Sequence, residues 1–258
     1  MVALRELGAE RLSKFRFMTS TFISTGRDYS LKGGHMEVEV RHRPVRYARL
    51  EIKPDGRIVV TAPRGFDVEA FIKKHERWLR NRLRELEEVR RESARGFPFF
   101  GEFYRLELGN VRKVELRDGK LILPAERERA RKALKELLRD RVTALVALYS
   151  VLMGVSPGKI YIRNQRTKWA SCSSRGNLSF NLRLVALPEK LIEYVVIHEL
   201  AHLRYLNHSK AFWRLVGRFY PDYGTARREL RRWWGVIEVN EGWRWLEGRE
   251  QDCSSSSR

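Results

Sequence analysis

Hydrophobic and polar residues alternate along the chain from residue 36 onward. Residues 37–41 read Glu-Val-Glu-Val-Arg, and two further segments, 46–53 and 57–62, flank the turn signal Pro54-Asp55-Gly56. Alternation places every second side chain on the same face of a sheet, which is typical of half-buried strands. This region is therefore predicted to form strands, with a hairpin at the Pro-Asp-Gly turn.

Later segments repeat their hydrophobic residues with helical spacing. Asp67 is placed to cap a helix that runs to about Glu92, with the apolar positions Phe71, Trp78, Leu79, Leu83 and Leu86. Further helices are predicted over 125–153, where Gly154 ends the helix, from Pro188 through residue 202, and from Pro221 to about Trp234. The strands expected between them are 99–108, 111–123 with a turn at Asp118-Gly119, 159–165, and 177–184 with Leu178, Phe180, Leu182 and Leu184 on one face.

The composition predicts a folded protein. Hydrophobic residues make up 43% and charged residues 33% of the 258 residues, which suffices for a buried core and excludes a disordered chain. No stretch approaches 18 consecutive apolar residues, and the charged N-terminal segment does not resemble a secretory signal, so neither a membrane span nor secretion is expected. Cys172 and Cys253 lie far apart in sequence, which predicts a cytoplasmic protein without a disulfide framework.

The chain is strongly basic, with a formal net charge of +20. No carboxylate occurs between Asp140 and Glu189, and this stretch contains Arg141, Lys159, Arg163, Arg166, Lys168, Arg175 and Arg183. A surface of this kind attracts anions such as acidic peptides, nucleotides or nucleic acid. The alternative is an arginine-rich surface that serves solubility or heat stability.

The segment His198-Glu199-Leu200-Ala201-His202 has the H-E-x-x-H pattern. Residues four apart stack on one helix face, so the two imidazoles can bind one zinc ion, and Glu199 beside them can act as a general base toward water. The alternative is a pair of histidines that only pack on a helix face. Three of the six histidines fall between residues 198 and 208, which favours the metal site.

A catalytic zinc ion needs a third protein ligand and an open position. His208 is the favoured candidate, and Glu229 on the next predicted helix is its rival. Six residues of continuous helix would turn His208 away from His202, so the helix must end between them if His208 is a ligand. Asn207 tolerates a left-handed cap, and Ser209 can cap a new helix, so the sequence permits this bend. The metzincin pattern is excluded because Tyr205 replaces its glycine and no methionine follows the motif.

Several sequence motifs together resemble those of one protein family. They are Asn-Gln-Arg-Thr-Lys-Trp-Ala-Ser-Cys-Ser-Ser at 164–174, Asn-Leu-Arg-Leu at 181–184, His-Glu-Leu-Ala-His-Leu at 198–203, Asn-His-Ser-Lys-Ala-Phe-Trp at 207–213 and Pro-Asp-Tyr at 221–223. Together they resemble the YgjP-like metal-dependent hydrolases, relatives of SprT-like and WLM-type zinc peptidases, across roughly residues 36–235. The resemblance implies a zincin-type domain with His198, His202 and His208 as metal ligands and Glu199 as the catalytic base. Ala170 stands where the family usually has glycine.

Residues 164–173 precede a strand that leads to the metal-binding helix, so they are expected to border its cleft. Substrate-binding candidates are Asn164, Gln165, Arg166, Lys168 and Tyr223, although the first two could equally tie neighbouring loops together. An edge strand here could also bind an extended peptide through its main chain. Among the remaining residues, Trp169 and Trp213 are expected in the core, Cys172 is expected to be a buried small residue, and Asp222 is expected to cap a helix or support a ligand histidine.

The sequence thus predicts an α+β protein whose N-terminal strand-and-helix module precedes a small zincin-like metallopeptidase domain. Its expected parts are an N-terminal extension (1–35), the strand-rich module with one long helix (36–124), the catalytic domain (125–235) and a partly disordered tail (236–258). The leading function is a zinc-dependent (Zn2+) metallopeptidase, with a peptide substrate. The alternatives are hydrolysis of a nucleoside triphosphate, and a nucleic-acid-binding protein with a structural zinc.

Overall fold

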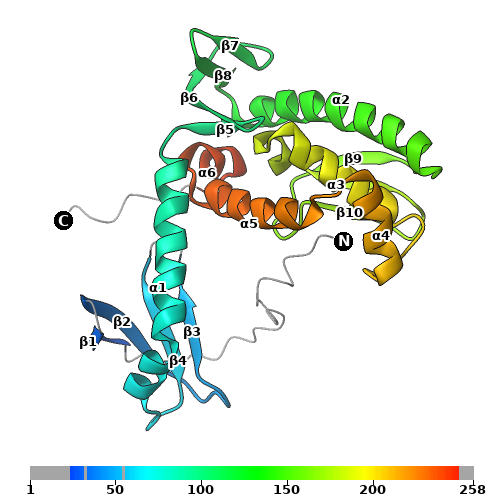
Figure 1. Ribbon diagram of the computed structural model, residues 1–258. Helices are drawn as coiled ribbons and strands as arrows, with labels where there is room; N and C mark the ends of the chain where they lie inside the picture. Colours follow the sequence, from blue (N-terminus) through cyan, green and yellow to red (C-terminus); the bar gives the residue numbers. More distant parts are fainter. Residues whose placement is uncertain (1–23, 32–33, 54–55, 250–258) are drawn as a thin grey trace. The chain divides into compact units, whose positions relative to one another are not determined.

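The computed structural model describes residues 24–31, 34–53 and 56–249. The described chain divides into two compact units that meet in sequence between Glu92 and Ser93. Both units combine helices with small sheets, so the predicted α+β class is confirmed (Figure 1). The residues of the expected N-terminal extension and tail that lie at 1–23, 32–33 and 250–258, and the turn residues Pro54 and Asp55, fall outside the described residues.

The first unit is a four-stranded sheet with one long helix. The sheet has the order β1-β2-β4-β3, and its elements are β1 (Ser24–Leu31), β2 (Gly34–His42), β3 (Arg49–Ile52), β4 (Ile58–Ala62) and helix α1 (Val68–Ser93). Strands β3 and β4 pair as the expected hairpin, whereas β2 and β4 run parallel. Asp67 caps α1 as predicted, since its carboxylate accepts a hydrogen bond from the Ala70 amide at 2.9 Å.

The core of this unit lies between the sheet and α1. Buried residues of β2 and β4 pack with Ile72 and Leu79 of the helix. Trp78 was expected on the same apolar face, but its side chain is 48% exposed, so this prediction is wrong. Trp78 directly precedes Leu79, and neighbouring residues on a helix point about 100° apart, so burying Leu79 leaves Trp78 at the edge of this face.

The second unit begins with a four-stranded sheet of order β5-β6-β8-β7. Its strands are β5 (Phe97–Phe99), β6 (Glu102–Gly109), β7 (Glu115–Arg117) and β8 (Lys120–Pro124). Asp118 and Gly119 join β7 to β8 with positive φ values of 49° and 70°, which confirms the predicted turn. Helix α2 (Arg127–Met153) follows and ends at Gly154, whose φ of 61° is the expected left-handed cap.

The second half of this unit contains a three-stranded sheet and four α-helices. The elements are β9 (Ile160–Arg163), β10 (Ala170–Cys172), β11 (Leu178–Asn181), the 3-10 helix η2 (Leu182–Ala186), α3 (Glu189–Ala201), α4 (Lys210–Phe219), α5 (Tyr223–Val239) and α6 (Glu241–Glu247). Strand order is β10-β11-β9, with β10 antiparallel to β11 at one edge. Helix α2 lies beside α3, and α3 contacts β10 (Figure 1).

The strand predicted over residues 177–184 is only half correct. It ends at Asn181, and the next five residues form η2 because the Asn181 side chain accepts a hydrogen bond from the Arg183 amide at 3.1 Å. Leu182 and Leu184 are buried in η2 as they would be in a strand. The hydrophobic pattern therefore identified the buried residues correctly but not the conformation of their backbone.

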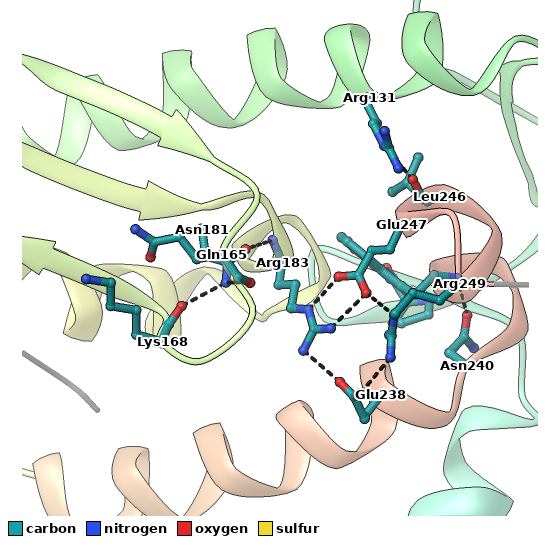
Figure 2. A network of polar contacts seen from close by, with 12 residues as sticks. Arg131, Gln165, Lys168, Asn181, Arg183, Glu238, Asn240, Leu246, Glu247 and Arg249 are labelled. Carbon is teal, nitrogen blue, oxygen red and sulfur yellow. Dashed lines mark hydrogen bonds and ion pairs between the residues drawn. The ribbon is translucent and has the colours of Figure 1, made fainter. Parts of the chain in front are cut away.

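A buried ion-pair network joins η2 to the last two helices (Figure 2). The Arg183 guanidinium is 2.6 Å from one Glu247 oxygen and 2.9 Å from a Glu238 oxygen, and it lies over the Trp234 ring at 4.4 Å. Arg249 completes the network with a 2.6 Å contact to Glu247. Two basic and two acidic side chains therefore balance one another, with Arg183 and Glu247 buried and with Glu238 and Arg249 partly exposed.

The border between the units differs from the predicted module boundary near residue 124. Strands β5 to β8 belong to the same unit as the helices that follow them. The residue after β5 is hydrogen-bonded to η2, since the Phe100 amide donates to the Val185 carbonyl at 2.7 Å. The assignment of functions to the predicted modules stays a prediction. None of the helices in the described ranges combines the length and apolar character that crossing a membrane requires.

Candidate metal centre

The H-E-x-x-H motif lies in the last turns of α3 and continues into a tight turn. The helix ends at Ala201, and His202 is its C-cap. Helix α4 starts at Lys210 after Ser209, whose hydroxyl accepts a hydrogen bond from the Phe212 amide at 3.4 Å. The predicted break between His202 and His208 is therefore confirmed. Asn207, which would tolerate a left-handed cap, does not adopt a positive φ, so the chain reverses without using this conformation.

This turn brings three imidazoles together. One nitrogen of each of His198, His202 and His208 lies within 4.8 Å of the other two. The Nε2 atoms of His198 and His208 are 3.1 Å apart. His198 and His202 are buried, and His208 is the exposed member of the group. The arrangement thus combines two buried imidazoles at the end of α3 with one exposed imidazole beyond the turn.

The ring of Phe212 contacts all three imidazoles. Its ring centroid is 4.9 Å from that of His198 and 4.7 Å from those of His202 and His208, and its side chain is fully buried. The sequence patterns did not indicate that Phe212 belongs to the site. Its position four residues after His208, in the first turn of a capped helix, was the available signal.

Trp213 and Tyr223 extend the aromatic cluster beside His208. The Trp213 ring stacks on His208 at 5.5 Å, and Tyr223 stacks on Trp213 at 5.1 Å. Trp213 is half-buried and touches the metal centre instead of lying deep in the core, whereas Trp169 is 4% exposed and packs against Trp234 as expected. Tyr223 therefore supports the wall around His208.

Hydrogen bonds at the second ring nitrogen orient two of the histidines. His202 Nδ1 is 3.0 Å from the Tyr205 carbonyl oxygen, which can only accept, so Nδ1 carries the proton and Nε2 is left as a lone-pair donor. His198 Nδ1 faces the Tyr194 hydroxyl at 3.5 Å. A neutral imidazole that is protonated on Nδ1 is the form in which Nε2 binds a metal ion.

The surroundings favour these neutral forms. Burial holds the pKa of His198 well below its usual range, and the neighbouring His202 and His208 lower it further. Burial likewise lowers the pKa of His202 to about 4 and, to a smaller extent, lowers that of His208. All three imidazoles are thus neutral at pH 7. A set of three neutral, converging imidazoles fits a borderline-soft divalent cation such as zinc.

Glu199 is fully buried beside this group and faces the edge strand β10. Burial raises the pKa of the half-buried Cys172 thiol, and the charge of Glu199 on the neighbouring helix raises it further. Cys172 does not join the three-histidine group among the described residues, and it is half-buried where a buried residue was expected. The buried Glu199, which directly follows His198 in α3, is therefore close enough to β10 for its charge to act on Cys172.

Four of the five predicted substrate-binding residues lie on the loop that enters β10, namely Asn164, Gln165, Arg166 and Lys168, whereas Tyr223 begins α5. Asn181 Nδ2 donates to the main-chain carbonyls of Gln165 at 2.8 Å and Lys168 at 2.7 Å, so this buried side chain fixes the loop (Figure 2). Asn164 and Arg166 are exposed. The sequence resemblance contained Asn181 but did not indicate this role.

Two other candidates have roles elsewhere. The Glu229 carboxylate is 2.7 Å from Arg232 and is not part of the three-histidine group, so the geometry favours His208 as the third ligand. Asp222 is the N-cap residue of α5, as one of its two predicted roles required, although its side chain makes no capping hydrogen bond.

The acid-free basic stretch does not form one open surface. Arg183 is buried in the network described above, and Arg141 pairs with Glu189 at 2.9 Å. Arg166 and Arg175 are exposed. The contribution of this stretch to anion attraction is therefore smaller than its residue count suggests.

An H-E-x-x-H helix with a third histidine returned by a turn defines the class of metal-dependent hydrolases. Within that class, the chain belongs to the YgjP-like family, whose model, described as a metallopeptidase domain, matches residues 46–233. The protein is thus a hydrolase of the metallopeptidase type, and the resemblance noted in its sequence is confirmed.

Three relatives illustrate this similarity. The UTP pyrophosphatase of Escherichia coli (strain K12) is 39% identical over 54 residues, which are 21% of this chain and about a third (32%) of that protein's length. The crystal structure of the metallopeptidase zymogen of Pyrococcus abyssi abylysin is 30% identical, with a TM-score of 0.31, over 34% of this chain and 86% of that chain. That of Methanocaldococcus jannaschii jannalysin is 20% identical, with a TM-score of 0.33, over 36% and 88%.

Proposed function

We propose that this protein is a zinc-dependent metallopeptidase in which His198, His202 and His208 hold the metal ion and Glu199 is the general base. The observation that carries this proposal is the convergence of three neutral imidazoles beside a buried carboxylate. When bound, a zinc ion would make water more acidic and polarise a carbonyl group.

The protein's own residues would manage the proton. Glu199 accepts a proton from the attacking water, and the same carboxylate returns it to the leaving amine as the peptide bond breaks. Its burial restricts access of bulk water to this proton. The three histidines would not act as general acids in this reaction because their environment keeps them neutral.

Strand β10 supports a peptide as the substrate. It is an edge strand of its sheet and lies against α3, next to Glu199. An extended peptide could pair with such an edge through main-chain hydrogen bonds, which would place a scissile bond along the strand. The loop of residues 164–168, which Asn181 holds, would then border the bound chain.

A second candidate is hydrolysis of a nucleoside triphosphate. It is favoured by the similarity to the UTP pyrophosphatase, an enzyme named for its nucleotide substrate. The exposed Arg166 and the nearby Lys168 would contact phosphates in this case. The same metal centre and the same Glu199 would serve both reactions, so the two candidates differ in substrate and not in the residues that activate water.

One experiment separates the two. Zinc-loaded protein is incubated with a peptide library and, separately, with each nucleoside triphosphate, and Glu199→Gln protein prepared in parallel is the control for contaminating hydrolases. Peptide cleavage that disappears in the control supports the leading proposal. Release of pyrophosphate that disappears in the control, without peptide cleavage, replaces it with the second candidate. Activity that persists in Glu199→Gln on every substrate overturns both. Action in the cytoplasm stays a prediction from the cysteine content.

A further inference from the structure

Tyr194 lies one helical turn before the first histidine of the motif. In α3, residues four apart lie on one face, so Tyr194, His198 and His202 form one row along the helix. Tyr194 is fully buried, and its ring meets that of His198 edge-on, with centroids 5.9 Å apart. Neither the family motif nor the metal chemistry described so far assigns a role to this tyrosine.

The walls around His198 are otherwise aromatic. Its imidazole is surrounded by the rings of Phe212 at 4.9 Å and Trp213 at 5.8 Å and by the two other histidines at 5.1 Å. Its Nε2 faces His208 at 3.1 Å, whereas its Nδ1 faces the Tyr194 hydroxyl at 3.5 Å. The side of the ring that points away from the metal site therefore meets this hydroxyl.

A metal ion on Nε2 requires the His198 proton on Nδ1. A buried Nδ1–H needs an acceptor, and metal-binding histidines generally find one in a carboxylate, a carbonyl group or water. His202 has the Tyr205 carbonyl in this position at 3.0 Å. For His198, the Tyr194 oxygen occupies the corresponding place.

We propose that Tyr194 is a positioning residue of the metal centre: its hydroxyl oxygen accepts the Nδ1 proton of His198 and so presents Nε2 to the metal ion. This inference rests on the metal site proposed above. Tyr194 touches neither substrate nor metal. It acts by fixing the ring orientation and tautomer of one ligand.

The tyrosine ring is itself held in place. It packs on the ring of Tyr220, with centroids 5.3 Å apart, at the C-terminal end of α4. Helix α4 begins directly after His208, so the Tyr194–Tyr220 contact fastens its far end to α3. The hydroxyl of Tyr194 is thus aimed at His198 by the same helix pair that carries the third ligand.

The test is the dissociation constant for zinc, measured by competition with a chromophoric chelator. Tyr194→Phe removes only the hydroxyl oxygen and is expected to weaken zinc binding by roughly 10- to 100-fold, the range found when such supporting groups are removed. Tyr220→Phe removes a hydroxyl from the packing partner and leaves His198 untouched, so its affinity should equal that of the unmodified chain. Thermal unfolding of the metal-free proteins checks that each variant is folded.

A purely structural role would lower metal-free stability without changing zinc affinity in the folded protein, and that result would overturn the proposal. Equal weakening by Tyr220→Phe would also overturn it, because the effect would then belong to the ring pair. If Tyr194→Phe does not fold, 3,5-difluorotyrosine at position 194 keeps the ring and hydroxyl but makes the oxygen a poorer acceptor, and unchanged affinity there would contradict the inference. An unmodified chain that binds no zinc would overturn the metal site together with this inference, whereas normal binding with an unaffected Tyr194→Phe would overturn the inference alone.

Discussion

The Nε2 atoms of His198 and His208 lie 3.1 Å apart, although ten residues and the end of a helix separate them in sequence. The approach depends on three features of the turn: α3 stops at Ala201, the chain reverses, and Ser209 starts α4. A continuous helix would have directed His208 to the opposite side. The third imidazole therefore reaches the other two because α3 ends before it.

The third ligand can be identified by zinc content. His208→Ala should lose most of the bound zinc because only two imidazoles remain, whereas Glu229→Gln should retain about one zinc ion per chain, since that carboxylate pairs with Arg232. Elemental analysis of identically prepared samples measures both. Full zinc occupancy in His208→Ala together with loss in Glu229→Gln would reverse the assignment.

Replacing the buried carboxylate separates chemistry from metal binding. Glu199→Gln keeps the size of the side chain but cannot accept a proton, so the hydrolysis rate should fall by about 10²- to 10⁴-fold. Zinc content and the thermal midpoint should remain close to those of the unmodified protein, because the three histidines are unchanged. Loss of zinc in this variant would instead make Glu199 part of the binding site.

The metal-free protein should lose stability as the pH falls below about 6.5. The pKa of His202 is about 4 in the folded chain, and burial also lowers the pKa values of His198 and His208, so the unfolded state takes up protons first. Each such proton changes the free energy of unfolding by about 1.4 kcal/mol per pH unit across the window between the two pKa values. Urea unfolding at pH 7 and at pH 5 measures this loss.

The pH effect has a matched control. His202→Gln removes one of the buried imidazoles. It should therefore reduce the difference in the free energy of unfolding between pH 7 and pH 5. His75, on α1, lies outside the three-histidine group, so His75→Gln should leave the difference unchanged. An equal pH response in His202→Gln and the unmodified chain would mean that the buried imidazoles do not control it.

Breaking the internal ion-pair network should be strongly destabilising. Glu247→Gln removes a carboxylate that is 7% exposed and leaves Arg183, 3% exposed, with a weaker set of partners, so the free energy of unfolding should fall by about 3–5 kcal/mol. The exposed pair of Arg82 and Glu85 is the control, since Glu85→Gln should change stability by less than about 1 kcal/mol. Chemical denaturation of both variants measures the difference. Similar losses of stability in the two variants would show that burial does not increase the contribution of Glu247 to stability.

Local signals predicted much of the structure. Asp67, Gly154 and Ser209 each act at the element boundary that their chemistry indicated, and the H-E-x-x-H spacing identified two of the converging imidazoles. These features depend on residues within four positions of one another. Such short-range relationships can be recognised from the sequence alone.

The remaining features depend on contacts across long sequence separations. The support that Phe212 gives to His198, and the fixing of the 165–168 loop by Asn181, involve residues whose types alone indicate only burial or polarity. Likewise, Arg183 is indistinguishable from a surface arginine until Glu247, 64 residues later, is brought beside it. Charge counting along the chain could not separate that buried cation from the exposed ones.

The position of Glu238 and Glu247 also bears on how the family can vary. Both acids lie beyond residue 233, where the match to the YgjP-like model ends, while the arginine that they neutralise lies within it. The charge balance of Arg183 therefore depends on a segment that the match to the family model does not cover. Relatives that lack an acidic residue in α6 are expected to carry an uncharged residue at the position of Arg183. The arginine and its acidic partner would then be lost together.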